Sequence, residues 1–279
     1  MPKSSKNTNR ATVRTNNKIS VFKDFYKFCD KFAVSKVSNN NDEYITNYCI
    51  ERDETKAYKI DYGFYNQFLE FYSNFINTNH EIVFTEKVPD ITYLKVHLQF
   101  NSQNKVKRPY TRDFIKKMVN IYINVFKKIL IFKEVECYLC ERDLPIKLDN
   151  GEYMYELELN FTNIVVSDKL AEFINLYVML LAEKNKCFGK TFKYNQLVKN
   201  IYTVYSKSDT FLYGSRTKFN KSPYVATILY YYQVSNIYGV DICEMDKIEN
   251  LLIHTIEMNL YTKSSMFFYV NLFSVRQGK

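Results

Sequence analysis

Alternating apolar and polar residues predict two half-buried β-strands in the middle of the chain, at residues 93–100 and 153–161. Successive side chains of a strand point to opposite faces, so each strand would have an apolar side and a polar side. In the first strand these sides consist of Leu94, Val96, Leu98 and Phe100 against Lys95, His97, Gln99 and Asn101. In the second strand they consist of Tyr153, Tyr155, Leu157, Leu159 and Phe161 against Met154, Glu156, Glu158 and Asn160. A shorter strand at residues 136–141 precedes the second, with a turn at 148–151 between them.

Two helices are predicted beside these strands. Apolar side chains recur at helical spacing over residues 111–129, where Thr111 can act as the N-cap and Asp113 lies in the first turn. A second helix begins after Ser167, a further N-cap residue, and runs to about residue 183. The order strand, helix, strand, strand, helix predicts an α+β domain in which a mixed sheet carries helices against one face.

Further elements are predicted before and after these strands and helices. Aromatic residues at helical spacing over 22–32 and 65–75 predict a helical region before the sheet. After residue 183 we expect a helix near 194–205, a strand around 211–214 and a helical end. Residues 1–18 hold five lysines and arginines, no acidic residue and few apolar ones, which predicts a disordered basic arm. The expected domains are therefore this arm, an α+β domain over 19–235 and an extension over 236–279 packed on it.

Composition excludes disorder throughout and predicts a soluble intracellular protein. Apolar residues make up 46% and charged residues 25%, which are ordinary globular proportions. No apolar run approaches the roughly 20 residues of a spanning helix, and the N-terminus has no apolar signal segment. Many Tyr, Phe, Lys and Asn residues beside no Trp and few Gly are typical of an A/T-rich genome, so the net charge of +9 is partly a codon effect. A basic surface still favours polyanions, although a solvated lysine-rich surface explains the same charge.

Sequence motifs for metals and cofactors are missing. Among six cysteines only Cys137 and Cys140 are close, and positions three apart on a strand point to opposite faces and cannot share a metal. We interpret them as reduced, apolar side chains. Gly189-Lys190-Thr191 lacks the first glycine of a phosphate-binding loop, and no hydrolase or zinc-protease motif is present. We expect no cofactor.

A series of short segments, in order, resembles the primase domain of large DNA-virus primase-helicases. These segments include Arg108-Pro109-Tyr110-Thr111, Glu141-Arg142-Asp143-Leu144-Pro145, Asn163-Ile164-Val165-Val166 and Tyr213-Gly214-Ser215-Arg216. The family is the poxvirus and giant-virus branch of the archaeo-eukaryotic primases, and the resemblance runs from about residue 20 to about residue 235. It implies the primase-like α+β fold that the pattern of strands and helices also favours.

The resemblance also implies that the catalytic residues are replaced. Family members hold divalent metals with two aspartates on the first strand and a third aspartate further on, and contact the nucleotide with a histidine. The positions that match the two aspartates, the histidine and the third aspartate here hold His97, Gln99, Glu158 and Tyr202. Two-metal phosphoryl transfer needs carboxylate ligands, so we expect a pseudoenzyme without a metal site. An alternative is a residual nucleotidyltransferase with a rearranged metal site at His97, Glu158 and Glu156.

Binding residues remain where the catalytic ones are missing. Ser215, Arg216 and Lys218 resemble the segment that lines the family's nucleotide and template groove, and a second basic cluster consists of Lys105, Lys107, Arg108 and Arg112. The leading hypothesis is a viral subunit of replication or gene expression, in the host cytoplasm and with packaging in virions left open. It would bind single-stranded DNA or RNA and a protein partner, and no membrane. The competing hypothesis is a scaffolding protein without a nucleic-acid role.

Overall fold

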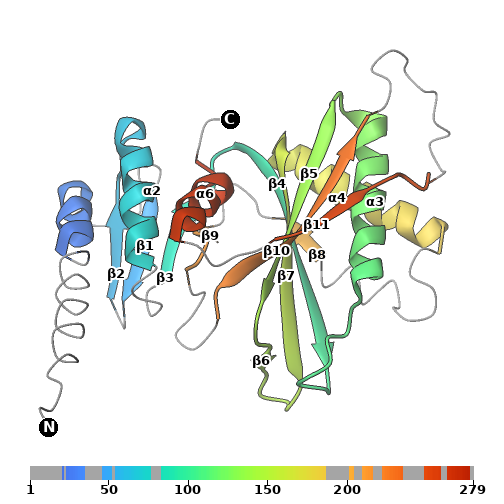
Figure 1. Cartoon of the computed structure of the whole chain (residues 1–279), viewed down its shortest axis with the longest axis horizontal. Helices are drawn as coiled ribbons and strands as arrows, with labels where there is room; N and C mark the ends of the chain where they lie inside the picture. Colours follow the sequence, from blue (N-terminus) through green and yellow to red (C-terminus); the bar gives the residue numbers. More distant parts are fainter. Residues whose placement is uncertain are drawn as a thin grey trace, which may run out of the picture. The chain divides into compact units, whose positions relative to one another are not determined.

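The computed structural model describes residues 21, 23–34, 46–51, 54–76, 83–186, 201–203, 209–215, 222–234, 248–258 and 263–276 (Figure 1). The chain divides into two compact units, each made of separate segments. Unit 1 consists of Met1–Lys87, Phe211–Asn220 and Tyr261–Lys279, and unit 2 of Val88–Thr210 and Lys221–Leu260. The expected arm at 1–18 and the expected boundary at residue 235 lie outside the described residues and stay predictions.

Unit 2 is built on a seven-stranded sheet with the order β11-β10-β5-β7-β4-β8, in which β6 also pairs with β7. Its strands are β4 (Ile91–Ser102), β5 (Glu134–Arg142), β6 (Ile146–Lys147), β7 (Tyr153–Ser167), β8 (Ile201–Thr203), β10 (Tyr224–Gln233) and β11 (His254–Glu257). All of these neighbouring pairs are antiparallel. The α+β class is confirmed, but the sheet is not mixed. The crossover from β4 to β5 joins two strands that run in the same direction, and β7 lies between them and is antiparallel to both.

Two helices pack against this sheet, as the sequence predicted. They are α3 (Arg112–Ile129) and α4 (Asp168–Lys184), whose inner residues form one core with Leu94, Val96, Leu98 and Phe100 of β4. The Thr111 hydroxyl accepts a hydrogen bond from the Phe114 amide at 3.1 Å and caps α3. Ser167 occupies the N-cap position of α4, but its side chain makes no capping hydrogen bond. Within the described ranges, no helix is long and apolar enough to cross a membrane.

Unit 1 combines helices with a small sheet, which the sequence pattern did not predict. Its helices are residues 23–29, the short η1 (Asp30–Phe32), α2 (Tyr62–Ile76) and α6 (Lys263–Phe273). The sheet has the order β2-β1-β3-β9. Its strands β1 (Asn47–Glu51), β2 (Glu54–Tyr58) and β3 (Val83–Lys87) belong to unit 1, whereas only Phe211 of β9 (Asp209–Phe211) does. The expected helical N-terminal region is therefore helical only in part. The five-residue strands β1 and β2 carry Asn, Glu and Lys, which are weak strand formers, and they are held by pairing with each other.

Aromatic side chains fill the core of unit 1. The ring of Phe25 stacks on that of Phe75 with centroids 4.3 Å apart, and both side chains are fully buried. Phe84 of β3 contacts Phe25 and Tyr72, so β3 belongs to the same core. Most of the aromatic residues at helical spacing are confirmed as core residues, namely Phe25, Phe28, Tyr65, Phe68, Tyr72 and Phe75. Tyr26 and Phe32 are half-buried, and Phe22 lies outside the described residues.

Two expected elements near the C-terminal half differ from the structure. Residues 201–203, expected in a helix near 194–205, form strand β8 and pair with β4. The strand expected at 211–214 ends at Phe211 and is followed by a turn at Tyr213 and Gly214. Gly214 has a φ of 79°, which glycine adopts without strain, so the chain leaves the strand there.

Candidate functional site

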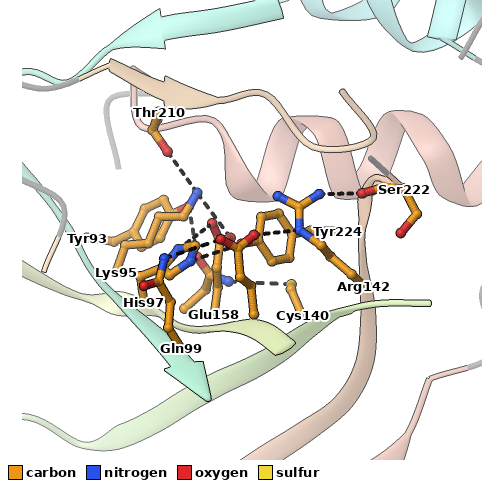
Figure 2. A network of polar contacts seen from close by, with 12 residues as sticks. Tyr93, Lys95, His97, Gln99, Cys140, Arg142, Glu158, Thr210, Ser222 and Tyr224 are labelled. Carbon is orange, nitrogen blue, oxygen red and sulfur yellow. Dashed lines mark hydrogen bonds and ion pairs between the residues drawn. The ribbon is translucent and has the colours of Figure 1, made fainter. Parts of the chain in front are cut away.

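The candidate site is the polar side of β4 and β7, on the face of the sheet opposite the α3 and α4 core. The antiparallel register places Lys95 opposite Asn160, His97 opposite Glu158, and Gln99 opposite Glu156. Directly opposed residues on one face of a sheet have neighbouring side chains. The alternation in the two strands therefore brings the predicted positions together in one cluster, in which His97 and Glu158 are buried and Gln99 is half-buried (Figure 2).

Glu158 is the centre of one half of this cluster. Its carboxylate lies 3.2 Å from Nζ of Lys95 and 3.5 Å from Nδ1 of His97. Lys95 also donates a hydrogen bond to the Thr210 hydroxyl at 2.9 Å. Burial alone would raise the pKa of Glu158, but the Lys95 ammonium and the His97 side chain lower it to about 2. Glu158 is therefore a carboxylate at neutral pH, and a lysine of the same strand pair neutralises it.

Glu156 is the centre of the other half. It accepts hydrogen bonds from Nε of Arg142 at 2.8 Å, from Nε2 of Gln99 at 3.2 Å and from the Tyr224 hydroxyl at 3.2 Å. Arg142 lies on β5 and donates a further hydrogen bond to the carbonyl oxygen of Ser222. Both halves of the cluster thus hold a buried carboxylate that is paired with a buried cation of the chain.

Tyr224 links the two halves from strand β10. Its ring covers the Arg142 guanidinium, whose central carbon lies 4.0 Å from the ring centroid. Its hydroxyl lies 3.0 Å from Nε2 of His97 as well as 3.2 Å from Glu156. Burial and the nearby Glu158 carboxylate raise the pKa of the Tyr224 phenol, so it stays protonated. The sequence pattern did not identify Tyr224 as a site residue, because its contacts depend on the pairing of β10 with β5.

The predicted role of a small apolar side chain fits Cys137 but not Cys140. Cys137 lies in the apolar core, whereas Cys140 lies on the polar side and accepts a weak hydrogen bond from Asn160 at 3.4 Å. Both are free thiols, and burial raises their pKa well above the usual range. They face opposite sides of β5 and do not share a metal site.

The polar side does not fit a pair of divalent metal ions. Such ions take several oxygen ligands that carry negative charge. Here His97 and Gln99 stand at the two positions that the resemblance assigns to aspartates, and Lys95 and Arg142 already pair with Glu158 and Glu156. Over the described ranges, no three or more His, Cys, Asp and Glu side chains are grouped so that they could hold a metal ion. The alternative site at His97, Glu156 and Glu158 therefore lacks support in the geometry.

Two of the four residues of the predicted basic cluster pair with a third buried carboxylate. Arg108 and Arg112 form ion pairs with Glu141, which is 1% exposed and also accepts hydrogen bonds from Tyr110 at 2.9 Å and Thr227 at 2.7 Å. Burial would raise the pKa of Glu141, but the Thr227 hydrogen bond and the two arginines lower it. The side chains of Arg108 and Arg112 remain 34% and 49% exposed, so both still reach the surface.

Lys105 and Lys107, the other two residues of the cluster, are exposed on a fixed loop. The Tyr155 hydroxyl donates to the carbonyl oxygens of Asn104 and Lys105, at 2.9 and 2.7 Å. The Asn104 side chain accepts hydrogen bonds from the amides of Val106 and Lys107, at 2.8 and 3.0 Å. The backbone of the loop is therefore held in place while its lysines point into solvent.

One turn further along α3, Lys116 and Lys117 are also exposed. The sequence predicted only a helix for them, although Lys116, four residues after Arg112, lies beside it on the helix surface, and Lys117 is the next residue in the chain. We call Lys105, Lys107, Arg108, Arg112, Lys116 and Lys117 the basic surface.

Of the predicted groove residues, Ser215 is described and belongs to unit 1. Ser215 is 1% exposed, and its hydroxyl accepts a hydrogen bond from the Phe84 amide at 2.6 Å within unit 1. Its hydroxyl is thus part of the unit 1 core. Arg216 and Lys218 lie outside the described residues, and of Tyr202 only the backbone is described, which pairs with His97 in the sheet.

Comparison of the sequence with known protein families finds a match to a primase family. Residues 46–230 match the model of the "C962R protein N-terminal AEP domain", where AEP stands for archaeo-eukaryotic primase. The match covers all the residues of the polar side and of the basic surface. No curated protein matches the chain in sequence.

Proposed function

Because the chain belongs to the family of the C962R protein N-terminal AEP domain, we propose that it is a nucleic-acid-binding member of this primase family that does not polymerise nucleotides. The family is normally one of nucleotidyltransferases. The observation that carries the proposal is the pairing on the polar side, where each buried carboxylate is neutralised by a cation of the chain itself.

The chemistry of primer synthesis explains why this pairing matters. Metal ions in such enzymes activate the attacking hydroxyl and neutralise the triphosphate, and carboxylates hold them. Displacing Lys95 from Glu158, or Arg142 from Glu156, would leave a buried cation unpaired, which costs several kcal/mol. A divalent ion would have to offset that cost with His97 and Gln99 in place of two acids. In this proposal, Lys95 and Arg142 neutralise the carboxylates of the site, a role that bound metal ions have in an active primase.

Nucleic-acid binding is supported by the basic surface. Cations that contact phosphates release condensed counterions, which drives binding without reading the sequence. The four lysines are exposed, and the two arginines are partly exposed while Glu141 fixes their position. A guanidinium whose geometry is already fixed loses less freedom when it binds a phosphate.

The test combines a synthesis assay with a binding assay on the same protein. We expect no primer synthesis on a single-stranded template with Mg²⁺ or Mn²⁺, and fluorescence anisotropy should show binding to labelled single-stranded DNA or RNA. Lys105→Glu should weaken binding several-fold. The matched control Lys133→Glu makes the same charge change at an exposed position between the C-terminal end of α3 and β5, and it should leave binding nearly unchanged. Binding should also weaken with salt, with a log–log slope of about −0.7 for each phosphate contacted.

Two outcomes would contradict the proposal in different ways. Primer extension that disappears in His97→Ala would mean that the alternative, a residual nucleotidyltransferase, is correct. Equal binding by the wild type, Lys105→Glu and Lys133→Glu would mean that the basic surface is only a solvated surface.

A scaffolding protein is the second candidate function, and Tyr224 favours it. Its ring covers Arg142 and its hydroxyl contacts His97 and Glu156, so an aromatic side chain occupies the polar side. If the protein binds no nucleic acid at low salt and instead recovers a protein partner, this candidate replaces the first.

A further inference from the structure

Helix α4 has apolar residues on two opposite sides. Its inner side packs in the core of unit 2 through Ala171, Ile174, Val178, Leu181 and Ala182. Its outer side carries Phe173, Leu176 and Leu180, which are 51, 58 and 58% exposed. A helix on the surface of a soluble domain normally turns polar residues outward. A row of three large exposed apolar side chains therefore marks a contact surface.

The spacing along this outer side is that of a helix–helix seam. Lys169, Phe173, Leu176, Leu180 and Glu183 follow one another at intervals of four, three, four and three residues. This is the spacing of positions a and d in a heptad, with which two helices pack along a common line. The row spans 14 steps of 1.5 Å, or about 21 Å along the helix. We call these five residues the α4 seam.

The charges at the two ends of the α4 seam indicate what it pairs with. Lys169 lies at the N-terminal end and Glu183 at the C-terminal end, and both are exposed. If a second α4 seam packs antiparallel, each Lys169 faces the Glu183 of the other copy and Leu176 faces Leu176 at the centre. A parallel arrangement would instead place like charges opposite each other, which is unfavourable. The seam is therefore complementary to itself in one orientation.

We propose that the protein forms a symmetric dimer through antiparallel packing of the α4 seams of two copies. An interface of this kind uses the same surface on both copies and closes after two, so it forms no chains. A row of three apolar residues is small compared with the roughly 800 Å² per partner of a standard interface. The dimer should accordingly be weak and depend on concentration, dissociating in the micromolar range.

Sedimentation velocity of the full chain between about 2 and 200 μM tests the proposal. We expect the weight-average sedimentation coefficient to rise from that of a monomer toward that of a dimer. Leu176→Lys should keep the protein monomeric over this range. The matched control Ile131→Lys, at a fully exposed position outside the α4 seam, should dimerise like the wild type.

Charge reversal tests the antiparallel orientation. Lys169→Glu and Glu183→Lys should each weaken the dimer several-fold, because each creates like-charge pairs at both ends of the seam. The double variant carries the reversed pair and should regain the affinity of the wild type. All four substituted positions, Leu176, Ile131, Lys169 and Glu183, are exposed. Circular dichroism checks that each variant folds. A monomer at every concentration, a dimer that Leu176→Lys leaves intact, or a double variant no stronger than the single ones would overturn the proposal.

Discussion

At the scale of single residues, the polar side of the sheet depends on pairs of opposite charge that are buried together. Lys95 is 4% and Glu158 6% exposed, and each would be costly to bury alone. Removing one partner of a buried pair typically costs 3–5 kcal/mol, whereas replacing both with apolar residues is often neutral. The stability of the folded protein therefore requires that Lys95 and Glu158 are either both present or both replaced.

Glu158→Gln should destabilise the protein by about 3 kcal/mol at pH 7, because Lys95 is then left without its carboxylate. The pKa of Glu158 is lowered to about 2 in the folded protein. Its stabilising effect is therefore complete above the unfolded pKa of about 4.3, and it is lost as the pH falls toward 2. Urea unfolding of the wild type should show this loss between pH 5 and 2, and Glu158→Gln should show a smaller one.

The double variant Lys95→Met/Glu158→Leu is the control for this prediction. It should be more stable than Glu158→Gln, because no buried charge is left unpaired. If the wild type and Glu158→Gln lose stability equally between pH 5 and 2, the Glu158 carboxylate is not held by Lys95 as described.

At the scale of secondary-structure elements, the ends of the two helices differ in a way that can be measured. Thr111 and Ser167 both occupy N-cap positions, but only the Thr111 side chain accepts a hydrogen bond from the helix backbone. Residue type alone predicts the same contribution from both. The structure predicts that only one of them contributes as a cap.

Thr111→Ala should lower the free energy of unfolding by about 1 kcal/mol, the usual cost of losing a cap. Ser167→Ala is the matched control and should cost clearly less, since its hydroxyl makes no capping hydrogen bond. Chemical denaturation of the two variants at neutral pH checks the difference. Equal costs would show that Ser167 also caps its helix in solution.

At the scale of the whole molecule, segments far apart in the sequence complete one unit. Glu86 on β3 is fully buried and accepts hydrogen bonds from the Tyr65 and Ser274 hydroxyls at 2.8 and 2.9 Å, and from the Val275 amide at 2.8 Å. The end of α6 is thus fastened to a strand 188 residues earlier in the chain. Unit 1 therefore joins residues of its first segment, Met1–Lys87, to residues of its last segment, Tyr261–Lys279.

Glu86→Ala should loosen this attachment, because it removes the carboxylate that accepts hydrogen bonds from three buried donors, and a buried hydrogen bond that is lost costs about 1–3 kcal/mol. Hydrogen exchange should speed up at residues 263–276, the Val275 amide included, because the segment loses its acceptor on β3. The amides of α3 in unit 2 serve as the internal control and should keep their exchange rates. Unchanged exchange at 263–276 would mean that apolar packing alone holds α6.

The sequence by itself determined the elements whose patterns are local. The alternation in β4 and β7, the helical spacing in α3 and α4 and the Thr111 cap depend only on neighbouring residues, because the period of a strand or helix sorts side chains onto faces. The same alternation placed His97 and Gln99 on the polar side of one strand and Glu158 on that of the other. The primase family, too, follows from ordered segments of the sequence, and the match over residues 46–230 confirms it.

Only the tertiary structure decided which of these polar residues pair. Register across β4 and β7 brings Lys95 to Glu158, and the pairing of β10 with β5 brings Tyr224 to Arg142 and Glu156. The tertiary structure also pairs both Arg108 and Arg112 with Glu141, and it places residues 201–203 in a strand. Such partners lie tens of residues apart, and a local pattern carries no information on strand order or register. The sequence determines which side chains are present. Whether a carboxylate can bind a metal or is neutralised by a lysine depends on which strands become neighbours and in which register.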